Sequence, residues 1–216
     1  MPDSPSAHRL LHGSDSTPFG RRVRIVLAEL GLPFERDITP TTGREHAQMA
    51  RLNPALQVPV LEDGGTVVYD SRVVVDYLLG KYPLPAGGQP PLRPHAISPM
   101  RHLEESLPQS SLETLTEAAV TIRQMEVSGV AREQSGYLQR HDARIIHILD
   151  WLEGRVRGDG FDPGLLTVAD ITLICALDFL EFYQLTEWRG RPGLERIHGA
   201  HRDRPSIRST HPGANA

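Results

Sequence analysis

Residues 12–31 constrain the fold of this chain most, because they join a short apolar segment to a hydroxyl-rich loop and then to an amphipathic helix. The loop contains Ser14, Ser16 and Thr17. Pro18 follows and suits the first position of a helix, where its missing N–H costs nothing. The sequence therefore predicts several hydroxyl groups at the positive end of a helix, a place that can hold an anion such as a thiolate.

Apolar residues recur at helical spacing after this loop, which predicts one buried helix face. They are Phe19, Val23, Val26, Leu27 and Leu30. The arginines of the same stretch lie off that face. They are Arg21, Arg22 and Arg24. Gly31 is expected to end the helix, because glycine tolerates the left-handed conformation found at helix C-termini.

Thr17 also has a purely structural interpretation. A Ser or Thr immediately before a helix usually caps its free N–H groups, and Thr17 ahead of Pro18 fits that role. Taken alone, this stretch favours the cap. The functional interpretation depends on the rest of the chain.

The first part of the chain predicts a compact α/β domain. Its expected strands are 8–12, 32–38, 58–61 and 66–69, with a loop at 39–42, a turn at 62–65 and helices at 18–30, 43–52 and from 70 onward. The first strand–helix–strand unit implies a right-handed crossover and parallel strands. The last two strands form a predicted hairpin.

After a linker rich in Pro and Gly, the remaining pattern is helical. The predicted organisation is a leader at 1–7, an α/β domain at 8–82, a linker at 83–95, a helical domain at 96–204 and a coil-like tail at 205–216. The expected helices are 97–127 with a bend at Pro108, 133–156, 171–182 and 193–201. The apolar surface of the second comprises Ile145, Ile146, Ile148, Leu149 and Leu152. Residues 167–170 form a predicted capping box, and the helix behind it is apolar on nearly every side, so we expect it at the domain centre.

Composition limits the classes of function. The 216 residues carry a formal net charge of −4, without the basic bias typical of proteins that bind nucleic acid or an anionic membrane. No apolar run approaches the roughly 18 residues of a membrane helix, and no signal peptide is visible. The single Cys175 excludes an internal disulfide and is expected to be an inert core thiol. We therefore predict a cytoplasmic protein.

The histidines indicate no metal site. There is no H-E-x-x-H motif, and His198 and His201 stand at helical spacing without a third ligand. We interpret both as surface residues. His12 is expected to be a packed or half-exposed residue rather than a base.

Two later segments resemble binding loops. In Gln57-Val58-Pro59 a proline opens a strand, and a cis Val58–Pro59 bond would turn the backbone of Val58 outward to pair with an extended peptide. Asp70-Ser71 begins a helix, whose free N–H groups can hold a carboxylate while Asp70 accepts from an ammonium group. Each segment alone is explained at least as well by local structure. Together with the hydroxyl loop, they suit a small peptide with a free amino-acid end and a thiol.

From about His8 to Pro212, the chain resembles cytosolic glutathione transferases. The resemblance rests on S-T-P-F-G-R-R-V-R-I-V-L-A-E-L-G, L-N-P-A-L-Q-V-P-V-L, Y-D-S-R-V-V-V-D-Y-L and the capping segment L-T-V-A-D-I. The resemblance implies an α/β thioredoxin-like N-terminal domain followed by an all-α C-terminal domain. It also implies glutathione as co-substrate on the first domain, an electrophilic and partly apolar second substrate, and a homodimer.

The same resemblance implies roles for the later binding loops. The main chain of Val58, beside cis-Pro59, would pair with the cysteinyl part of glutathione. Asp70 and Ser71 would hold the γ-glutamyl end. Gln57 would lie near the glycyl end.

In the first loop, the resemblance implies a hydroxyl that donates a hydrogen bond to the glutathione sulfur. Thr17, directly before the helix proline, occupies the position of this donor in many relatives, and Ser16 and Ser14 stay open as alternatives. The loop contains no Cys, which argues against the thiol-exchange classes. The acceptor pocket is expected along this loop, residues 103–112 and the C-terminal segment.

Three functions follow as hypotheses. The first is a transferase that joins glutathione to an electrophile. The second is another glutathione-dependent reaction, such as isomerisation, ether cleavage, dehalogenation or disulfide reduction. The third is a non-catalytic binding protein on the same fold, which fold alone does not exclude.

Overall fold

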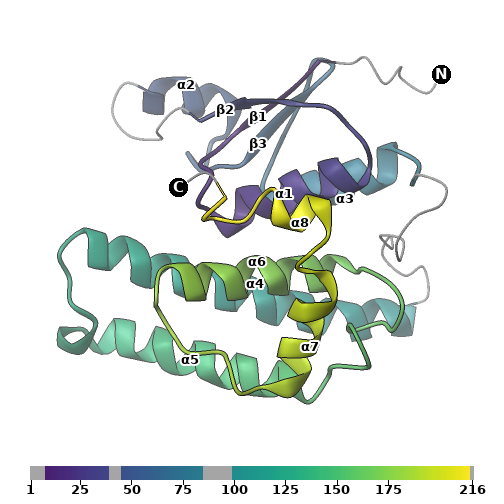
Figure 1. Cartoon of the computed structure of the whole chain (residues 1–216). Helices are drawn as coiled ribbons and strands as arrows, with labels where there is room; N and C mark the ends of the chain where they lie inside the picture. The colour runs from purple at the N-terminus through teal and green to yellow at the C-terminus, as the bar shows by residue number, and fades with distance from the viewer. Residues whose placement is uncertain (1–7, 39–44, 85–98, 215–216) are drawn as a thin grey trace. The chain divides into compact units, whose positions relative to one another are not determined.

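The computed structural model describes residues 8–38, 45–84 and 99–214 of the chain. The chain divides into two compact units, Met1–Gly87 and Gly88–Ala216. The first contains a sheet with helices, and the second is helical (Figure 1). The predicted fold class, an α/β thioredoxin-like domain followed by an all-α domain, is confirmed. The predicted domain boundaries at 8–82 and 96–204 stay predictions.

A four-stranded mixed sheet organises the first unit. Its strands are β1 (Arg9–His12), β2 (Glu35–Asp37), β3 (Val60–Asp63) and β4 (Thr66–Tyr69), in the order β2-β1-β3-β4. β1 and β2 are parallel, which confirms the parallel pairing predicted from the first strand–helix–strand unit. The β1–β3 and β3–β4 pairs are antiparallel.

The hairpin differs from the predicted one in the positions of its first strand and its turn. We expected a strand at 58–61 and a turn at 62–65, but β3 runs from Val60 to Asp63. Pro59 has no N–H to give to the ladder, so regular pairing begins after it. The turn contains only Gly64 and Gly65, whose φ angles of 58° and 89° match the left-handed conformations that a tight two-residue hairpin turn requires.

Helix α1 (Pro18–Glu29) buries most of its predicted apolar face, although Phe19 is only half-buried. Val23, Val26 and Leu27 are completely buried, and Leu30 is nearly so. Gly31 ends the helix with a φ of 66°, and Leu32 N–H donates to the Leu27 carbonyl. The arginines off the apolar face are buried as well: Arg21, Arg22 and Arg24.

Helix α3 (Ser71–Lys81) packs beside α1, and Figure 1 shows the two side by side beneath the sheet. Helix α2 (Glu45–Leu52) completes the unit. The predicted loop at 39–42 and the first residues of the helix predicted at 43–52 lie outside the described residues.

A buried charge network joins the first strand to the hairpin and to the end of α3. Asp63 pairs with the Arg9 guanidinium at 3.1 Å and accepts hydrogen bonds from Tyr82 (2.6 Å), Tyr77 (2.9 Å) and Lys81 (3.1 Å). Burial by itself raises the pKa of Asp63, but the bonds from the two tyrosines and Lys81 outweigh it and hold the pKa below its ordinary value. Asp63 is therefore ionised and fully partnered.

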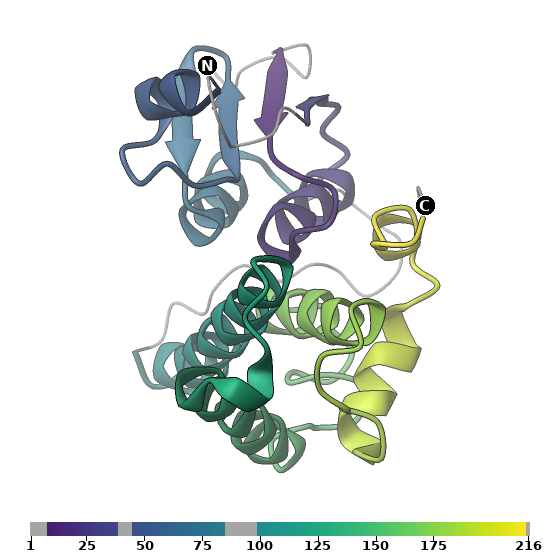
Figure 2. The same ribbon diagram turned by 90° about the vertical axis from the view of Figure 1, so that its left-hand side faces the viewer.

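The second unit is a helical bundle (Figure 2). It comprises α4 (Pro99–Val127), a 3-10 turn η1 (Arg132–Gln134), α5 (Gly136–Glu153), α6 (Val168–Phe182), α7 (Pro192–His201) and α8 (Pro205–Arg208). Helix α4 lies beside α5 and α6, and α7 contacts both α5 and α6. Pro108 lies inside α4.

Helix α6 is the centre of this unit, as predicted. Residues 168–180 are all buried, including Cys175 at 1% exposure. The predicted capping box is present, because Asp170 N–H donates to the Thr167 hydroxyl and the Asp170 carboxylate accepts from Thr167 N–H. Burial raises the pKa of Asp170 to about 6, although the bonds from Thr167 and Phe161 favour its ionised form.

The predicted apolar surface of α5 is partly wrong. Ile145, Leu149 and Leu152 are buried, but Ile146 is 39% exposed. The buried residues recur at spacings of four and three, which places them on one helix face, whereas Ile146 is rotated off it. Ile148 is only half-buried.

The two α7 histidines are not surface residues. His198 is 8% exposed and His201 is 3% exposed. They lie on the face of α7 that also buries Leu194 and Ile197, so helix packing covers them. His198 Nε2 lies 2.6 Å from the Asp178 carboxylate on α6, which supplies the polar partner that a buried imidazole needs.

The tail predicted as coil from residue 205 begins with a short helix. In α8 Ile207 is 1% exposed and Ser206 is buried, and Thr210, which follows the helix, is buried as well. A single apolar residue among polar ones has no visible periodicity, so the sequence does not reveal this packing.

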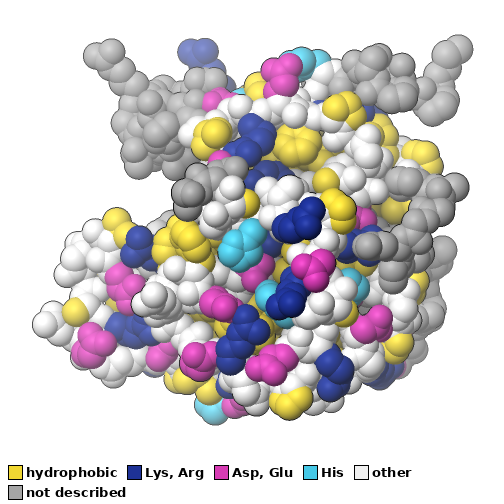
Figure 3. Space-filling view, viewed as in Figure 1, with side chains coloured by type: hydrophobic (Ala, Val, Ile, Leu, Met, Phe, Trp, Pro, Cys, Tyr) yellow, Lys and Arg dark blue, Asp and Glu magenta, His cyan; other side chains and the backbone are white. Residues whose placement is uncertain are grey.

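The described surface shows mixed charge. On the face seen in Figure 3, basic and acidic side chains are interspersed over the helical unit. Within residues 8–38, 45–84 and 99–214, no helix combines the length and apolar character needed to cross a membrane.

Candidate functional site

The hydroxyl loop sits between β1 and α1, and Thr17 is the N-cap of the helix. Its Oγ1 accepts a hydrogen bond from Gly20 N–H at 3.1 Å. A hydroxyl that accepts in this way still has its own proton to donate. The cap and a hydrogen bond to a bound sulfur are therefore compatible, so the two interpretations of Thr17 do not exclude each other.

The two serines of the loop are bonded to each other. Ser14 Oγ accepts from Ser16 N–H at 3.2 Å, and the two hydroxyl oxygens lie 2.9 Å apart. One hydroxyl proton must lie between these oxygens, so the pair has only one proton left to donate. Thr17 therefore keeps its own proton, whereas the two serines have one between them.

The first loop lies against the Val58–Pro59 segment. A Cβ atom added to Gly13 would stand 3.6 Å from Val58 Cβ and 3.9 Å from Pro59 Cα. The Val58–Pro59 peptide bond is cis. Among the described residues, the backbone of Val58 has no hydrogen-bond partner, which leaves its N–H and C=O for an extended peptide.

Asn53 holds the segment that leads into this bond. Its side-chain nitrogen donates to the Gln57 carbonyl at 2.7 Å, and its oxygen accepts from Ala55 N–H at 2.9 Å. Asn53 is 2% exposed, whereas the Gln57 side chain is exposed. We did not predict this role, and the Asn53-Pro54 pair that ends α2 was its only signal in the sequence.

Asp70 caps α3 from an unusual backbone conformation, with a φ of 66°. Non-glycine residues rarely adopt positive φ, and such residues cluster at functional sites. One carboxylate oxygen of Asp70 accepts from the N–H groups of Arg72 (2.9 Å) and Val73 (3.2 Å). Among the described residues, the Ser71 N–H remains without a partner at this helix end, which makes it available to an anion.

Arg22 links the first helix to the third. Its guanidinium donates to the Ser71 hydroxyl, and both side chains are buried. Sequence reasoning placed Arg22 only off the apolar face of α1. No local pattern indicates a partner that lies so far along the chain, so this contact could not be predicted.

His12 is a structural residue, as expected. It is 4% exposed, with Nδ1 at 3.0 Å from Asp37 and Nε2 at 2.7 Å from Glu62. Both ring nitrogens thus make their polar contacts with side chains of the neighbouring strands. His12 therefore bridges three strands behind the loop.

The arrangement can bind a small anionic peptide. The helix N-termini at Pro18 and Ser71 both attract negative charge, and the main chain of Val58 is available to pair with an extended peptide. The described residues contain no group of three or more His, Cys, Asp and Glu side chains suited to a metal ion.

Comparison with known proteins identifies both units. Residues 11–89 match the family model described as "Glutathione S-transferase, N-terminal domain", and residues 135–215 match "Glutathione S-transferase, C-terminal domain". The uncharacterized GST-like protein YibF of Escherichia coli is 27% identical over 174 residues, which cover 80% of this chain and 82% of that protein.

A shorter match links the chain to the stringent starvation protein A homolog of Haemophilus ducreyi. The two are 39% identical over 77 residues, which make up 35% of this chain. The match spans only 33% of the length of that relative.

Solved structures share the fold over nearly the whole chain. A glutathione S-transferase of Methylobacillus flagellatus with glutathione bound has a TM-score of 0.80 and 25% identity, covering 94% of this chain and 99% of that one. A glutathione S-transferase of Methylobacterium radiotolerans in complex with glutathione sulfonate has a TM-score of 0.78 and 28% identity, covering 97% of each chain. With both of its domains matched and its fold shared, the chain belongs to the glutathione S-transferase family.

Proposed function

We propose that the protein is an enzyme that conjugates the thiolate of reduced glutathione to an electrophilic, partly apolar substrate. The sulfur attacks the electrophilic carbon and forms a C–S bond, while a leaving group departs with its electron pair or, in an addition, the product takes up a proton. The glutathione bound to the similar Methylobacillus flagellatus enzyme supports glutathione as the co-substrate.

The observation that carries the proposal is the state of the Thr17 hydroxyl. It accepts from Gly20 N–H and so keeps its proton for a sulfur at the N-terminus of α1. A free thiol with a pKa of about 8.5 is only a few per cent ionised near neutral pH. Lowering that pKa by about two units requires roughly 2.7 kcal/mol of differential stabilisation. One hydrogen bond to a charged group, about 1.5–3 kcal/mol, has this size.

The rest of glutathione would use the other two segments. The main chain of Val58 pairs with the cysteinyl residue, and Gln57 lies near the glycyl end. The Asp70 carboxylate accepts from the γ-glutamyl ammonium group. The Ser71 N–H and hydroxyl donate to the γ-glutamyl carboxylate. The hydroxyl already accepts a hydrogen bond from Arg22, so its own proton is left to donate.

The test has two stages. Calorimetric titration with reduced glutathione should show binding at millimolar concentration or tighter, and S-methylglutathione should bind similarly because the amino-acid contacts are unchanged. A panel containing an activated aryl halide and an unsaturated ketone should then yield conjugates. Absence of binding would favour the non-catalytic protein, and binding without conjugation would favour another glutathione-dependent reaction.

We also propose a cytoplasmic homodimer, from the resemblance to the family. Light scattering of the purified chain should give twice the monomer mass of 24.0 kDa. A monomer mass at micromolar concentration would contradict the dimer.

A further inference from the structure

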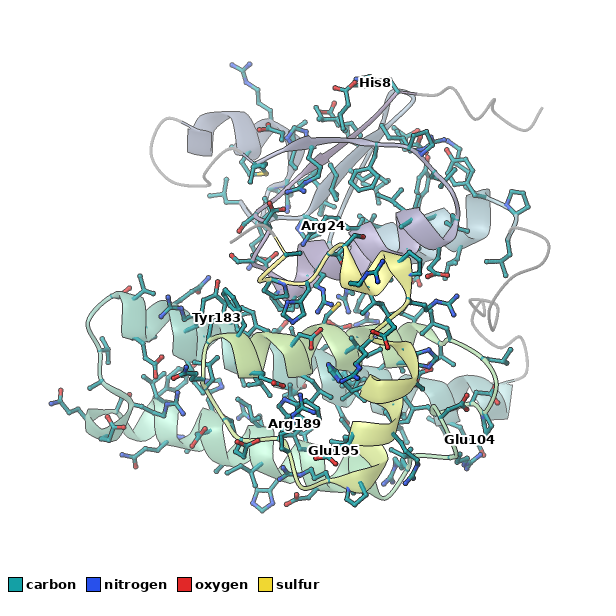
Figure 4. The ribbon with its side chains drawn as sticks, viewed as in Figure 1. His8, Arg24, Glu104, Tyr183, Arg189 and Glu195 are labelled. Carbon is teal, nitrogen blue, oxygen red and sulfur yellow. The ribbon has the colours of Figure 1, made fainter. Side chains whose placement is uncertain are left out.

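Asp15 lies in the loop that carries the three hydroxyls, and its side chain forms a cluster with Arg24 and Arg36. Arg24 lies on α1, where Figure 4 labels it, and Arg36 lies on β2. Arg24 Nη1 donates to the Asp15 carboxylate at 3.2 Å, and its Nη2 donates to the Asp15 backbone carbonyl at 2.7 Å. Arg36 forms an ion pair with the same carboxylate oxygen.

Asp15 stands at the apex of this loop, between the bonded serines. The Ser14–Ser16 contacts close the turn from inside, and the two arginines hold its apex. Gly20 lets the turn fold onto the helix, since an added Cβ there would lie 3.1 Å from Thr17 Oγ1 and 3.4 Å from the Ser14 carbonyl. Asp15 is therefore bound to two separate elements, to α1 through Arg24, which contacts both its carboxylate and its backbone carbonyl, and to β2 through Arg36, which contacts its carboxylate.

The Arg24 contacts are also shielded from water. Its side chain is 5% exposed, against 32% for Asp15 and 29% for Arg36. A bidentate contact from a buried arginine is more directional than an exposed ion pair, because the planar guanidinium fixes the geometry of its acceptors. Arg24 thus fixes the orientation of Asp15, and Arg36 adds a second positive charge beside the Asp15 carboxylate.

We propose that Asp15 is a positioning residue for thiolate formation, which holds the Ser14–Thr17 loop so that its hydroxyl donor faces the sulfur. This inference rests on the proposed function, but it concerns a residue to which that function assigns no contact with the sulfur or with the amino-acid ends of glutathione. A carboxylate beside a thiolate would, by charge alone, hinder ionisation of the thiol. Its presence in this loop is explained by geometry.

The charge of Asp15 and its positioning of the loop act in opposite directions on the thiol pKa of bound glutathione, so a measurement of this pKa distinguishes them. Asp15→Asn keeps the size of the side chain and removes its charge. If charge alone mattered, the thiol pKa of bound glutathione would fall. If Asp15 positions the loop, the pKa should rise by about one unit, with a roughly tenfold smaller thiolate fraction and kcat at pH values below the pKa.

The experiment combines thiol titration by ultraviolet absorbance, steady-state kinetics, and calorimetry with S-methylglutathione. We expect an unchanged dissociation constant for S-methylglutathione, since its amino-acid contacts lie elsewhere. Asp15→Glu should restore part of kcat because it keeps the carboxylate. Asp203→Asn, which removes the same charge from a site 84% exposed, is the matched control and should change neither quantity.

If Asp15→Asn does not fold, Arg36→Met tests the same positioning role. It removes the more exposed partner and leaves both Arg24 bonds, so the thiol pKa should rise by less than in Asp15→Asn. A lowered or unchanged pKa in the folded variants overturns the positioning role while leaving glutathione binding intact. Failure of the wild-type protein to bind glutathione overturns the proposed function, and the positioning role falls with it.

Discussion

The Arg22 guanidinium on α1 donates a hydrogen bond to the Ser71 hydroxyl at the start of α3, and the two residues are only 2% and 3% exposed. A guanidinium has no acceptor, so the direction of this bond is fixed. Ser71 must accept, and its own proton stays available for a carboxylate. The contact therefore connects the N-terminal regions of two helices. It also leaves the Ser71 hydroxyl as a hydrogen-bond donor at the start of α3.

This contact predicts that Arg22→Met weakens glutathione binding about tenfold and leaves kcat at saturating glutathione nearly unchanged. The loss corresponds to about 1.4 kcal/mol, within reach of one hydrogen bond from a charged donor. Calorimetry and the split between KM and kcat measure it. Arg72→Met, on the exposed side of the same helix start, is the matched control. A collapse of kcat with unchanged KM would contradict the prediction.

Thr17→Val should raise the thiol pKa of bound glutathione by about two units, because it removes the proposed donor while keeping the shape of the side chain. The affinity for glutathione should hardly change. Thr17→Ser should retain the low pKa. The loss of the cap should also reduce the free energy of unfolding by about 1 kcal/mol, measured by urea titration. If the thiol pKa stays the same, Ser16→Ala and Ser14→Ala will show which other hydroxyl acts.

Asn53→Ala should reduce both stability and glutathione affinity. It removes the donor to the Gln57 carbonyl and the acceptor for Ala55 N–H at a site that is 2% exposed. Ala55 and Gln57 are themselves exposed, so each lost hydrogen bond should cost about 0.5–1.5 kcal/mol. Denaturant unfolding and calorimetry check the two effects. Normal affinity in a destabilised Asn53→Ala protein would show that Asn53 supports the fold but not the Val58 segment.

The Asp63 network predicts a loss of stability in acid. The folded protein holds the pKa of Asp63 below its ordinary value of 3.8, so the ionised group stabilises the fold above that pH. This contribution should be lost as the pH falls through 3.8 toward the folded pKa.

Asp63→Asn tests this pH dependence. The variant should be less stable near neutral pH, by about 3 kcal/mol, because it leaves the buried Arg9 without its charged partner. Its free energy of unfolding should then change less than that of the wild type on acidification. Urea titrations at several pH values measure both slopes. Parallel slopes for the two proteins would rule out Asp63 as the group responsible.

Local patterns predicted much of the fold. The proline after Thr17, the glycine after Leu30 and the Thr167–Asp170 box mark helix ends through chemistry confined to one turn, and all three are confirmed. The buried α6 is also confirmed, because a helix that is apolar all round can be satisfied only in a core. The segments proposed to hold glutathione were visible for the same reason, and their roles toward it stay predictions.

Tertiary packing decided what local chemistry left open. Whether Ile146 or His198 is buried depends on the direction in which α5 and α7 face their neighbours, and the predictions for both were wrong. The partner of Arg22 lies 49 positions away and that of Arg24 lies nine positions back. The sequence by itself determined which side chains can donate, cap or ionise. Only the folded chain decided which residues meet across long stretches of sequence, because such a hydrogen bond depends on distance in space and leaves no pattern in the spacing of residues along the chain.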